Sequence, residues 1–256
     1  MQLSAILESL FRWTHVVSGI LWIGLLYFFN WVNSAFAPKL DADTRKKVVP
    51  ELMPRALYWF RWGAAWTWTT GVILIAMVFY HGRVVFDAEN TWNAGAFVMI
   101  AVVFLAPFFY DALMKSVGKK NMKAAIAVGF VLVALVVWLL GHWARFSYRG
   151  YVIHTGTMFG TIMAFNVWFR IWPAQKTIIG AVKNGEPPPA DLVALAGTRS
   201  RHNTYLSIPL VWTMINQHTI WANTGPLSWL YLLGAILLGW WIGTMLFKRA
   251  PKVAGF

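Results

Sequence analysis

The chain alternates long runs of apolar residues with shorter polar segments. Each run has roughly 19–26 residues, which is the length that an α-helix needs to cross the hydrocarbon core of a bilayer. The pattern therefore predicts an all-α integral membrane protein, a bundle of about seven transmembrane helices in which residues 1–256 form one membrane-embedded domain. The predicted helices cover about 11–36, 58–80, 93–113, 123–143, 151–172, 204–222 and 227–247.

Composition supports this interpretation, because 59% of the 256 residues are hydrophobic and only 12% are charged. The net charge of +13 would favour nucleic-acid binding in a soluble protein. Here 18 of the 22 Lys and Arg residues fall in the loops and tail of one predicted side, so the charge predicts orientation. We expect the N-terminus outside, the C-terminus in the cytoplasm, contact with anionic lipid of the bilayer, and no nucleic-acid partner.

Cysteine is absent, which excludes disulfides, thiolate metal ligands, iron-sulfur clusters and covalently attached c-type haem. The sequence also lacks a Walker loop, a dinucleotide fingerprint, a nucleophile elbow and a His-Glu-x-x-His pair. Hydrolase and kinase chemistry of those types is therefore not expected, and a redox or electron-transfer role remains. The segment NGEPPPADL at 184–192 predicts a bend in a loop, because proline cannot continue a helix.

The histidines are unevenly distributed along the predicted helices. His202 is expected at a cytoplasmic helix end, and in one continuous helix it would lie about 24 Å from His218. It either caps that end or belongs to a second polar site, such as a second haem, a quinone headgroup or a proton entry point. The other five histidines fall near predicted outer ends: His15, His81, His142, His154 and His218.

Histidines at one depth have two interpretations. Interfacial histidines anchor helix ends, whereas imidazoles on facing helices hold a b-type haem, which needs no cysteine. His15, His154 and His218 lie slightly deeper, so they are the candidate ligands of the haem iron, and His142 and His202 are further cofactor-binding candidates. A copper or zinc site would use the same three histidines. Haem is favoured over a bare metal because 17 Trp and 18 Phe can supply an apolar slot.

The outer side also carries a weakly positive rim, where an anionic substrate or an acidic region of a partner could dock. Its acidic residues are fewer than its arginines. The rim consists of Arg12, Arg83, Arg145 and Arg149 with Glu8, Asp87 and Glu89.

Four segments resemble the membrane domain of bacterial cytochrome c-linked urate oxidases, and the resemblance covers nearly the whole chain. It implies a multi-pass protein of the bacterial inner membrane, and in that family oxidation of urate to 5-hydroxyisourate is linked to reduction of cytochrome c. It also implies that His15, His154, His202 and His218 stand at positions where the family carries histidine. The segments are RWTHVVSGILWIG at 12–24, YWFRWGAAWTWTTG at 58–71, YVIHTGTMFGTIMAFNVWFRIWPAQ at 151–175 and RSRHNTYLSIPLVWTMINQH at 199–218.

The chain departs from the family pattern in two respects. No Cys-x-x-Cys-His motif follows the last apolar run, and Tyr58 and Gly63 stand where the family tends to have His and Glu. We therefore predict a haem b-binding membrane subunit that exchanges electrons with a separate cytochrome c or with other subunits of a membrane redox complex. The alternatives are a urate oxidase acting with a separate cytochrome c, and a non-redox membrane scaffold or transporter.

Overall fold

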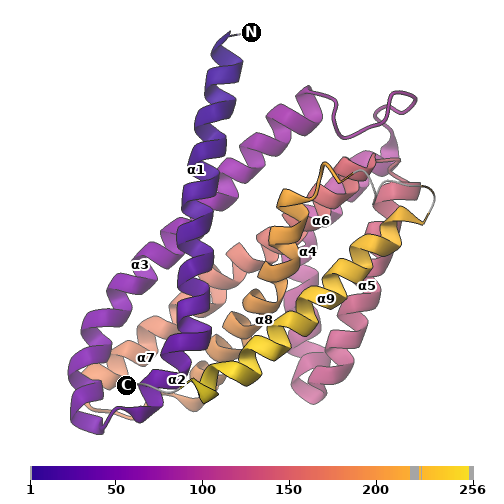
Figure 1. The fold of residues 1–256 in the computed structure, drawn as a ribbon. Helices are drawn as coiled ribbons and strands as arrows, with labels where there is room; N and C mark the ends of the chain where they lie inside the picture. Colours follow the sequence, from indigo (N-terminus) through magenta and orange to yellow (C-terminus); the bar gives the residue numbers. More distant parts are fainter. Residues whose placement is uncertain (1, 220–224, 226, 254–256) are drawn as a thin grey trace. The chain divides into compact units, whose positions relative to one another are not determined.

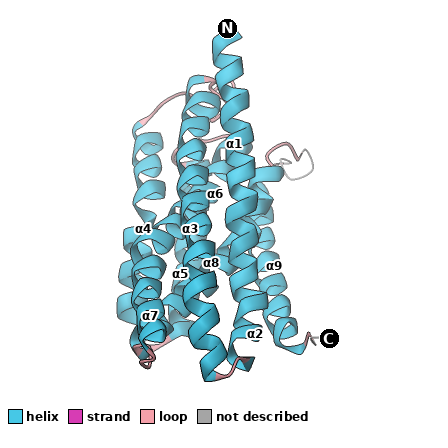
Figure 2. Ribbon diagram, turned by 90° about the vertical axis from the view of Figure 1, so that its left-hand side faces the viewer, coloured by secondary structure: helices cyan, strands magenta, loops and turns pink. Residues whose placement is uncertain are grey.

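The computed structural model describes residues 2–219, 225 and 227–253, and its regular secondary structure in these residues is entirely helical (Figures 1 and 2). The prediction of an all-α protein is confirmed. The elements are α1 (Gln2–Tyr27), η1 (Phe28–Asn33), α2 (Ser34–Phe36), η2 (Ala37–Lys39), α3 (Ala42–Leu74), η3 (Ile75–His81), α4 (Ala94–Lys120), α5 (Met122–His142), α6 (Tyr148–Asn166), η4 (Val167–Ile171), α7 (Trp172–Asn184), α8 (Ala190–Ile215), α9 (Ser228–Arg249) and η5 (Ala250–Lys252).

Five helical stretches are long and apolar enough to cross a membrane, which indicates a multi-pass membrane protein. The predicted spans 151–172 and 204–222 correspond to α6 with η4 and to α8, which bury several polar side chains. The side of the membrane on which each end lies remains a prediction. The five stretches are Leu3–Lys39, Ala42–His81, Ala94–Lys120, Met122–His142 and Ser228–Lys252.

Several helices extend further than the apolar pattern predicted. α3 begins at Ala42 instead of about residue 58, and α7 and the first part of α8 occupy the connection expected between helices five and six. Charged side chains at exposed positions let these helices continue beyond their apolar parts. The predicted bend is confirmed, because α7 ends before Gly185, which has a φ of 77°, and α8 begins at Ala190.

The predicted span 204–222 is wrong at its C-terminal end. α8 stops at Ile215, so His218 lies in a turn beyond the helix and the 24 Å helical separation from His202 does not apply. Asn216 explains the stop, because its side-chain amide donates to the Trp212 carbonyl at 3.1 Å and its side-chain oxygen accepts from the Thr219 hydroxyl at 3.1 Å. Such local hydrogen bonds compete with helix continuation. Residues 220–222 lie outside the described residues.

The described chain divides into two compact units, and α3, α6, α8 and α9 have residues in both. Unit 1 contains the described residues of 1–72, 163–207 and 240–256. Its core draws on five elements: Trp22 and Leu26 of α1, Met53, Leu57, Phe60 and Ala64 of α3, Met163 of α6, Val167 and Ile171 of η4, and Ile179 of α7.

Two polar contacts and one close approach fix the helices of unit 1. Asn166 donates to the Asn203 side chain at 2.9 Å, and Asn203 donates to the Met163 carbonyl at 3.0 Å, so a buried amide pair links neighbouring helices. At Gly63, an added Cβ would lie 3.3 Å from the Ser18 carbonyl oxygen and 3.3 Å from the Trp22 nitrogen. α1 and α3 therefore approach backbone to backbone at this glycine.

Unit 2 contains residues 73–162 and the described residues of 208–239. Asn93 caps α4 by accepting from Ala96 N at 3.0 Å, and its amide donates to the Ala144 carbonyl at 3.0 Å. Ser147 bonds to the carbonyls of Val84 and Val85 at 3.0 and 2.9 Å, through its hydroxyl and its backbone N–H. These bonds hold the segment after η3 against the segment that leads into α6.

Candidate functional site

His15 lies half-buried on α1 against α3, within unit 1. Its Nδ1 is 2.9 Å from the Thr67 carbonyl oxygen and 3.3 Å from Thr70 Oγ1. The Thr70 hydroxyl donates to the Trp66 carbonyl at 2.6 Å, so both neighbours of Nδ1 act as acceptors and the ring proton belongs on Nδ1. Gly71 leaves room for the ring, since a Cβ there would be 3.0 Å from Cε1. The lone pair of His15 is therefore on Nε2.

His154 lies fully buried on α6, within unit 2. Its Nδ1 is 2.6 Å from the Gly150 carbonyl oxygen, and its Nε2 is 2.9 Å from the Tyr80 hydroxyl. The carbonyl can only accept, so Nδ1 carries the proton and Nε2 accepts from the Tyr80 phenol. The Phe146 and Tyr80 rings lie against the imidazole, with centroids 4.6 and 5.7 Å away. Both ring nitrogens of His154 are thus engaged within the chain.

His218 lines a polar hollow of about 470 Å³ in unit 2. Arg149 Nη2 donates to His218 Nδ1, and because a guanidinium has no acceptor, the imidazole proton belongs on Nε2. The Tyr148 hydroxyl donates to the Asn216 carbonyl at 3.2 Å, which ties the start of α6 to the turn after α8. The lining residues are Gly82, Arg83, Val84, Phe86, Asp87, Ser147, Tyr148, Arg149, Gln217, His218 and Thr219.

Cationic side chains outnumber acidic ones around this hollow. Arg83 and Arg149 face one carboxylate, Asp87, so the electrostatic potential of the hollow favours an anion. Arg83 is held in the left-handed region, with a φ of 55°, which is uncommon for a residue with a side chain. Of the rim predicted from the sequence, these two arginines line the hollow, while Arg12 pairs with Glu8 at 2.7 Å.

The remaining candidate histidines are in different surroundings. His142 is exposed at the end of α5, where it stacks on Trp138 with ring centroids 4.8 Å apart. His202 is half-buried on α8 in unit 1, three residues after the buried Arg199. Among the described residues, no group of three or more His, Asp and Glu side chains is placed to hold a metal ion.

The histidines differ in how well they fit a haem. His15 could hold an iron, because the Thr67 carbonyl fixes its Nδ1–H and leaves the Nε2 lone pair for a metal. His154 does not fit in this conformation, since its Nε2 accepts from Tyr80 and its side chain is completely buried. Of these two histidines, His15 therefore fits a metal ligand and His154 does not. The exposed His142 shares the feature of His15, because the Trp138 carbonyl oxygen is 2.9 Å from its Nδ1.

The two positions that depart from the family pattern lie on α3. Tyr58 is 46% exposed and lies beside Arg61, whose guanidinium is 5.6 Å from the Tyr58 ring centroid and 3.9 Å from that of Trp172. A carboxylate side chain at position 63 would meet the backbone of α1 in this packing. Glycine at 63 is therefore part of how the two helices approach.

Sequence reasoning missed the partners of these histidines. Tyr80 is 74 residues from His154, and Arg149 is 69 residues from His218. The rim on the predicted outer side, where arginines outnumber acidic residues, was the sequence signal that pointed to the hollow, because Arg83, Arg149 and Asp87 belong to both.

Comparison with known proteins agrees with the family resemblance seen in the sequence. A family model described as urate oxidase N-terminal matches residues 2–254 of the chain. No curated protein and no solved structure matches it. The match includes all the helices that carry the candidate histidines.

Proposed function

The chain belongs to the urate oxidase N-terminal family, and from this we propose that it is a membrane oxidoreductase that binds urate, or a closely related anion, in the polar hollow of unit 2. The observation that carries the proposal is the pairing of Arg149 with His218 beside Arg83 in one hollow. Urate is a planar anion at neutral pH, rich in carbonyl oxygens and N–H groups. Guanidinium groups suit such a ligand because they offer several donors in one plane.

The polar side chains of the hollow suit different parts of such a ligand. Arg149 holds His218 Nδ1, so the imidazole offers Nε2–H as a donor to a ligand oxygen. Arg83 supplies a second cationic donor, and Gln217 supplies an amide that can donate and accept. Asp87 is the one carboxylate of the lining and can accept from a ligand N–H. Together they would bind the ring edge of an anion and fix its orientation.

The proposed reaction balances without any oxidant held by the chain. Urate and water give 5-hydroxyisourate, two protons and two electrons. Two molecules of an oxidised one-electron carrier, such as a separate ferricytochrome c, take up the two electrons. The cationic hollow would also stabilise negative charge that develops on the ring as protons leave.

A second function, electron transfer through a b-type haem, is favoured by His15. Thr67 and Gly71 place the imidazole with its Nε2 lone pair available, and that nitrogen would hold the iron. The group, when bound, would supply one-electron transfer. His15 and Thr67 would bind and orient it.

Urate-dependent reduction of added cytochrome c by the purified chain tests the first proposal. Arg149→Ala should raise KM by about 10- to 100-fold, because a hydrogen bond to a charged group contributes about 1.5–3 kcal/mol. Arg145→Ala is the matched control, since Arg145 is an exposed arginine of the same unit that does not line the hollow. Absence of urate turnover by the wild-type chain, or equal effects of the two variants, would contradict the proposal.

Arg83 allows a second matched pair. Arg83 and Arg145 both have a positive φ, 55° and 57°, so glycine relieves the same backbone strain at either position. Arg83→Gly should weaken urate binding without loss of stability, whereas Arg145→Gly should leave binding unchanged. A pyridine haemochrome spectrum of wild type, His15→Ala and His81→Ala tests the haem, with His81 as the control because it is an exposed histidine outside the candidate set. The haem role requires that only the His15 variant loses the signal.

A further inference from the structure

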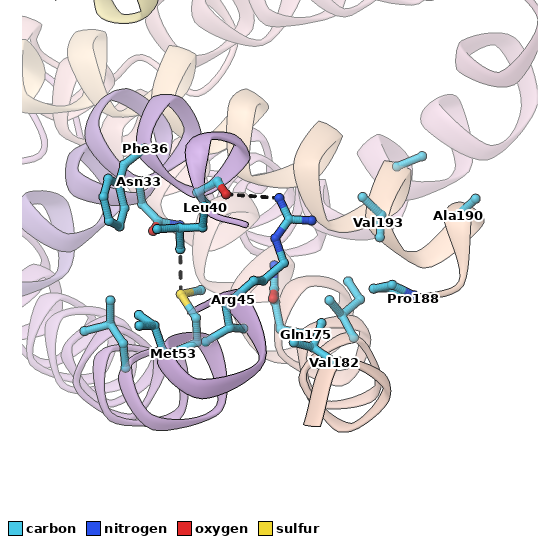
Figure 3. Close-up of a pocket in the computed structure, with 16 residues that line it drawn as sticks. Asn33, Phe36, Leu40, Arg45, Met53, Gln175, Val182, Pro188, Ala190 and Val193 are labelled. Atoms are coloured by element: carbon cyan, nitrogen blue, oxygen red, sulfur yellow. Dashed lines mark hydrogen bonds between the residues drawn. The ribbon is translucent and has the colours of Figure 1, made fainter. Parts of the chain in front are cut away.

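A second hollow lies in unit 1. Its lining comes from other segments of the chain than that of the polar hollow, and it is mostly apolar. Its volume is about 660 Å³, within the range of about 300–1,000 Å³ that is typical of ligand pockets. It is bounded by η2, the start of α3, α7 and the start of α8 (Figure 3). Apart from the ring of Phe36, its apolar lining is aliphatic or a thioether and includes Leu40, Leu52, Val182, Val193 and Ala194.

The polar part of this hollow is small and cationic. Arg45 is the only charged side chain among the described residues that line it, accompanied by the amides of Asn33 and Gln175. Figure 3 shows the Arg45 side chain extending between Leu40 and Val193. One of its five donors is used, because Nη2 donates to the Ala37 carbonyl at 3.0 Å. The remaining N–H groups can reach an anionic ligand.

The surroundings of the hollow add positive charge. Lys46 Nζ lies over the left-handed Gly185 at the end of α7, 3.2 Å from where a Cβ would be. Lys39 and Lys47 are exposed in the same short segment. Asp41 opposes them, but its carboxylate accepts from the Thr44 backbone and hydroxyl at 2.9 and 2.6 Å. The segment is part of the Lys- and Arg-rich side that the sequence predicts to face the cytoplasm.

We propose that this hollow is a binding site for an anionic phospholipid, with an acyl chain against the aliphatic lining and the headgroup phosphate on Arg45. Charge complementarity favours this occupant, because a basic pocket between helices on the cytoplasmic side of a membrane suits an anionic headgroup. The aliphatic lining suits a hydrocarbon chain, whereas a quinone ring would be expected to meet more aromatic surface than the single ring of Phe36 provides. Arginine binds phosphate through two parallel N–H bonds.

The site has no role in the proposed oxidation, since it shares no residue with the polar hollow. The proposal therefore stands or fails separately from urate turnover. It predicts that the chain selects lipids by headgroup charge and that one guanidinium is responsible for the selection.

Native mass spectrometry of the purified, delipidated full chain, titrated with phosphatidylglycerol or with phosphatidylcholine of the same acyl chains, tests the proposal. The wild type should retain phosphatidylglycerol with about tenfold preference, as expected for one charge-assisted hydrogen-bonding group. Arg45→Gln should remove the preference. Arg55→Gln should keep it, because Arg55 is an exposed arginine of the same helix that bonds to Glu51 at 2.6 Å and does not line the hollow.

A filling variant tests the acyl-chain part of the site. Ala194→Phe should reduce retention of both lipids, because the new ring occupies space in the hollow. Equal retention of the two lipids by the wild type would overturn the proposal, as would equal losses in Arg45→Gln and Arg55→Gln. Retention of a quinone that phosphatidylglycerol does not displace would identify a different occupant and would also overturn it.

Discussion

Replacing Tyr80 by Phe tests whether the buried hydrogen bond to His154 stabilises the fold. The phenol donates to His154 Nε2 at 2.9 Å, and the His154 side chain is 0% exposed. Removing the hydroxyl leaves the ring volume of residue 80 almost unchanged but leaves Nε2 buried without a donor. The other ring nitrogen stays bonded to the Gly150 carbonyl, so the imidazole cannot turn to compensate without breaking a second bond.

An acceptor left unsatisfied in the interior costs about 1–3 kcal/mol. For a chain of this size, each kcal/mol lowers the unfolding midpoint by about 2–4 °C, so the midpoint of Tyr80→Phe should fall by about 2–12 °C. Thermal unfolding in detergent, followed by circular dichroism at a fixed scan rate, measures this apparent midpoint.

Tyr58→Phe provides the control, because it is the same chemical change on a ring that is 46% exposed. Its unfolding free energy should change by less than about 0.5 kcal/mol. If His154 instead used Nε2 to bind iron in the working protein, Tyr80→Phe would cost little stability and would preserve or increase haem content. An unchanged midpoint in the Tyr80 variant would therefore refute the structural role.

Three further predictions test packing, pH dependence and topology. Gly63→Ala should destabilise by about 1–3 kcal/mol because the methyl group meets the α1 backbone, whereas Gly24→Ala, with no atom within 4 Å of the new Cβ, should not destabilise; equal thermal shifts would contradict this. Hydrogen bonds from Thr44 lower the pKa of Asp41, so its contribution to stability is present above the unfolded-state pKa and is lost as pH falls through the lowered folded-state pKa. The difference in unfolding midpoint between wild type and Asp41→Asn should accordingly shrink on acidification, and a difference that grows would be inconsistent with this sign. A phosphatase fused after Lys252 should be inactive if that end faces the cytoplasm, and an active fusion would reverse the predicted orientation.

Helix existence was predictable because it depends on local properties of the chain. Runs of apolar residues predicted the helices α1, α3, α4, α5, α6, α8 and α9. Each run is long enough to form a helix that crosses a bilayer, and that length can be counted from the sequence. The proline cluster at 184–192 likewise predicted the break between α7 and α8. Helix ends were less predictable. The N-terminal extension of α3 and the stop of α8 before Asn216 depend on exposed charges and on individual side-chain hydrogen bonds, which hydropathy does not report.

The apolar runs alone were enough to predict an all-α protein with long apolar helices, and the sequence also shows the family of the chain. It places five of the six histidines near one predicted side and most Lys and Arg residues on the other. What each histidine contacts depends on the fold. His15 meets Thr67 across 52 residues of chain, and His154 meets Tyr80 across 74. Hydropathy reports the free energy of burying each helix, and each residue adds to that free energy largely independently of its neighbours. The partner of a polar side chain depends instead on which helix faces pack together, and that is a property of the whole fold.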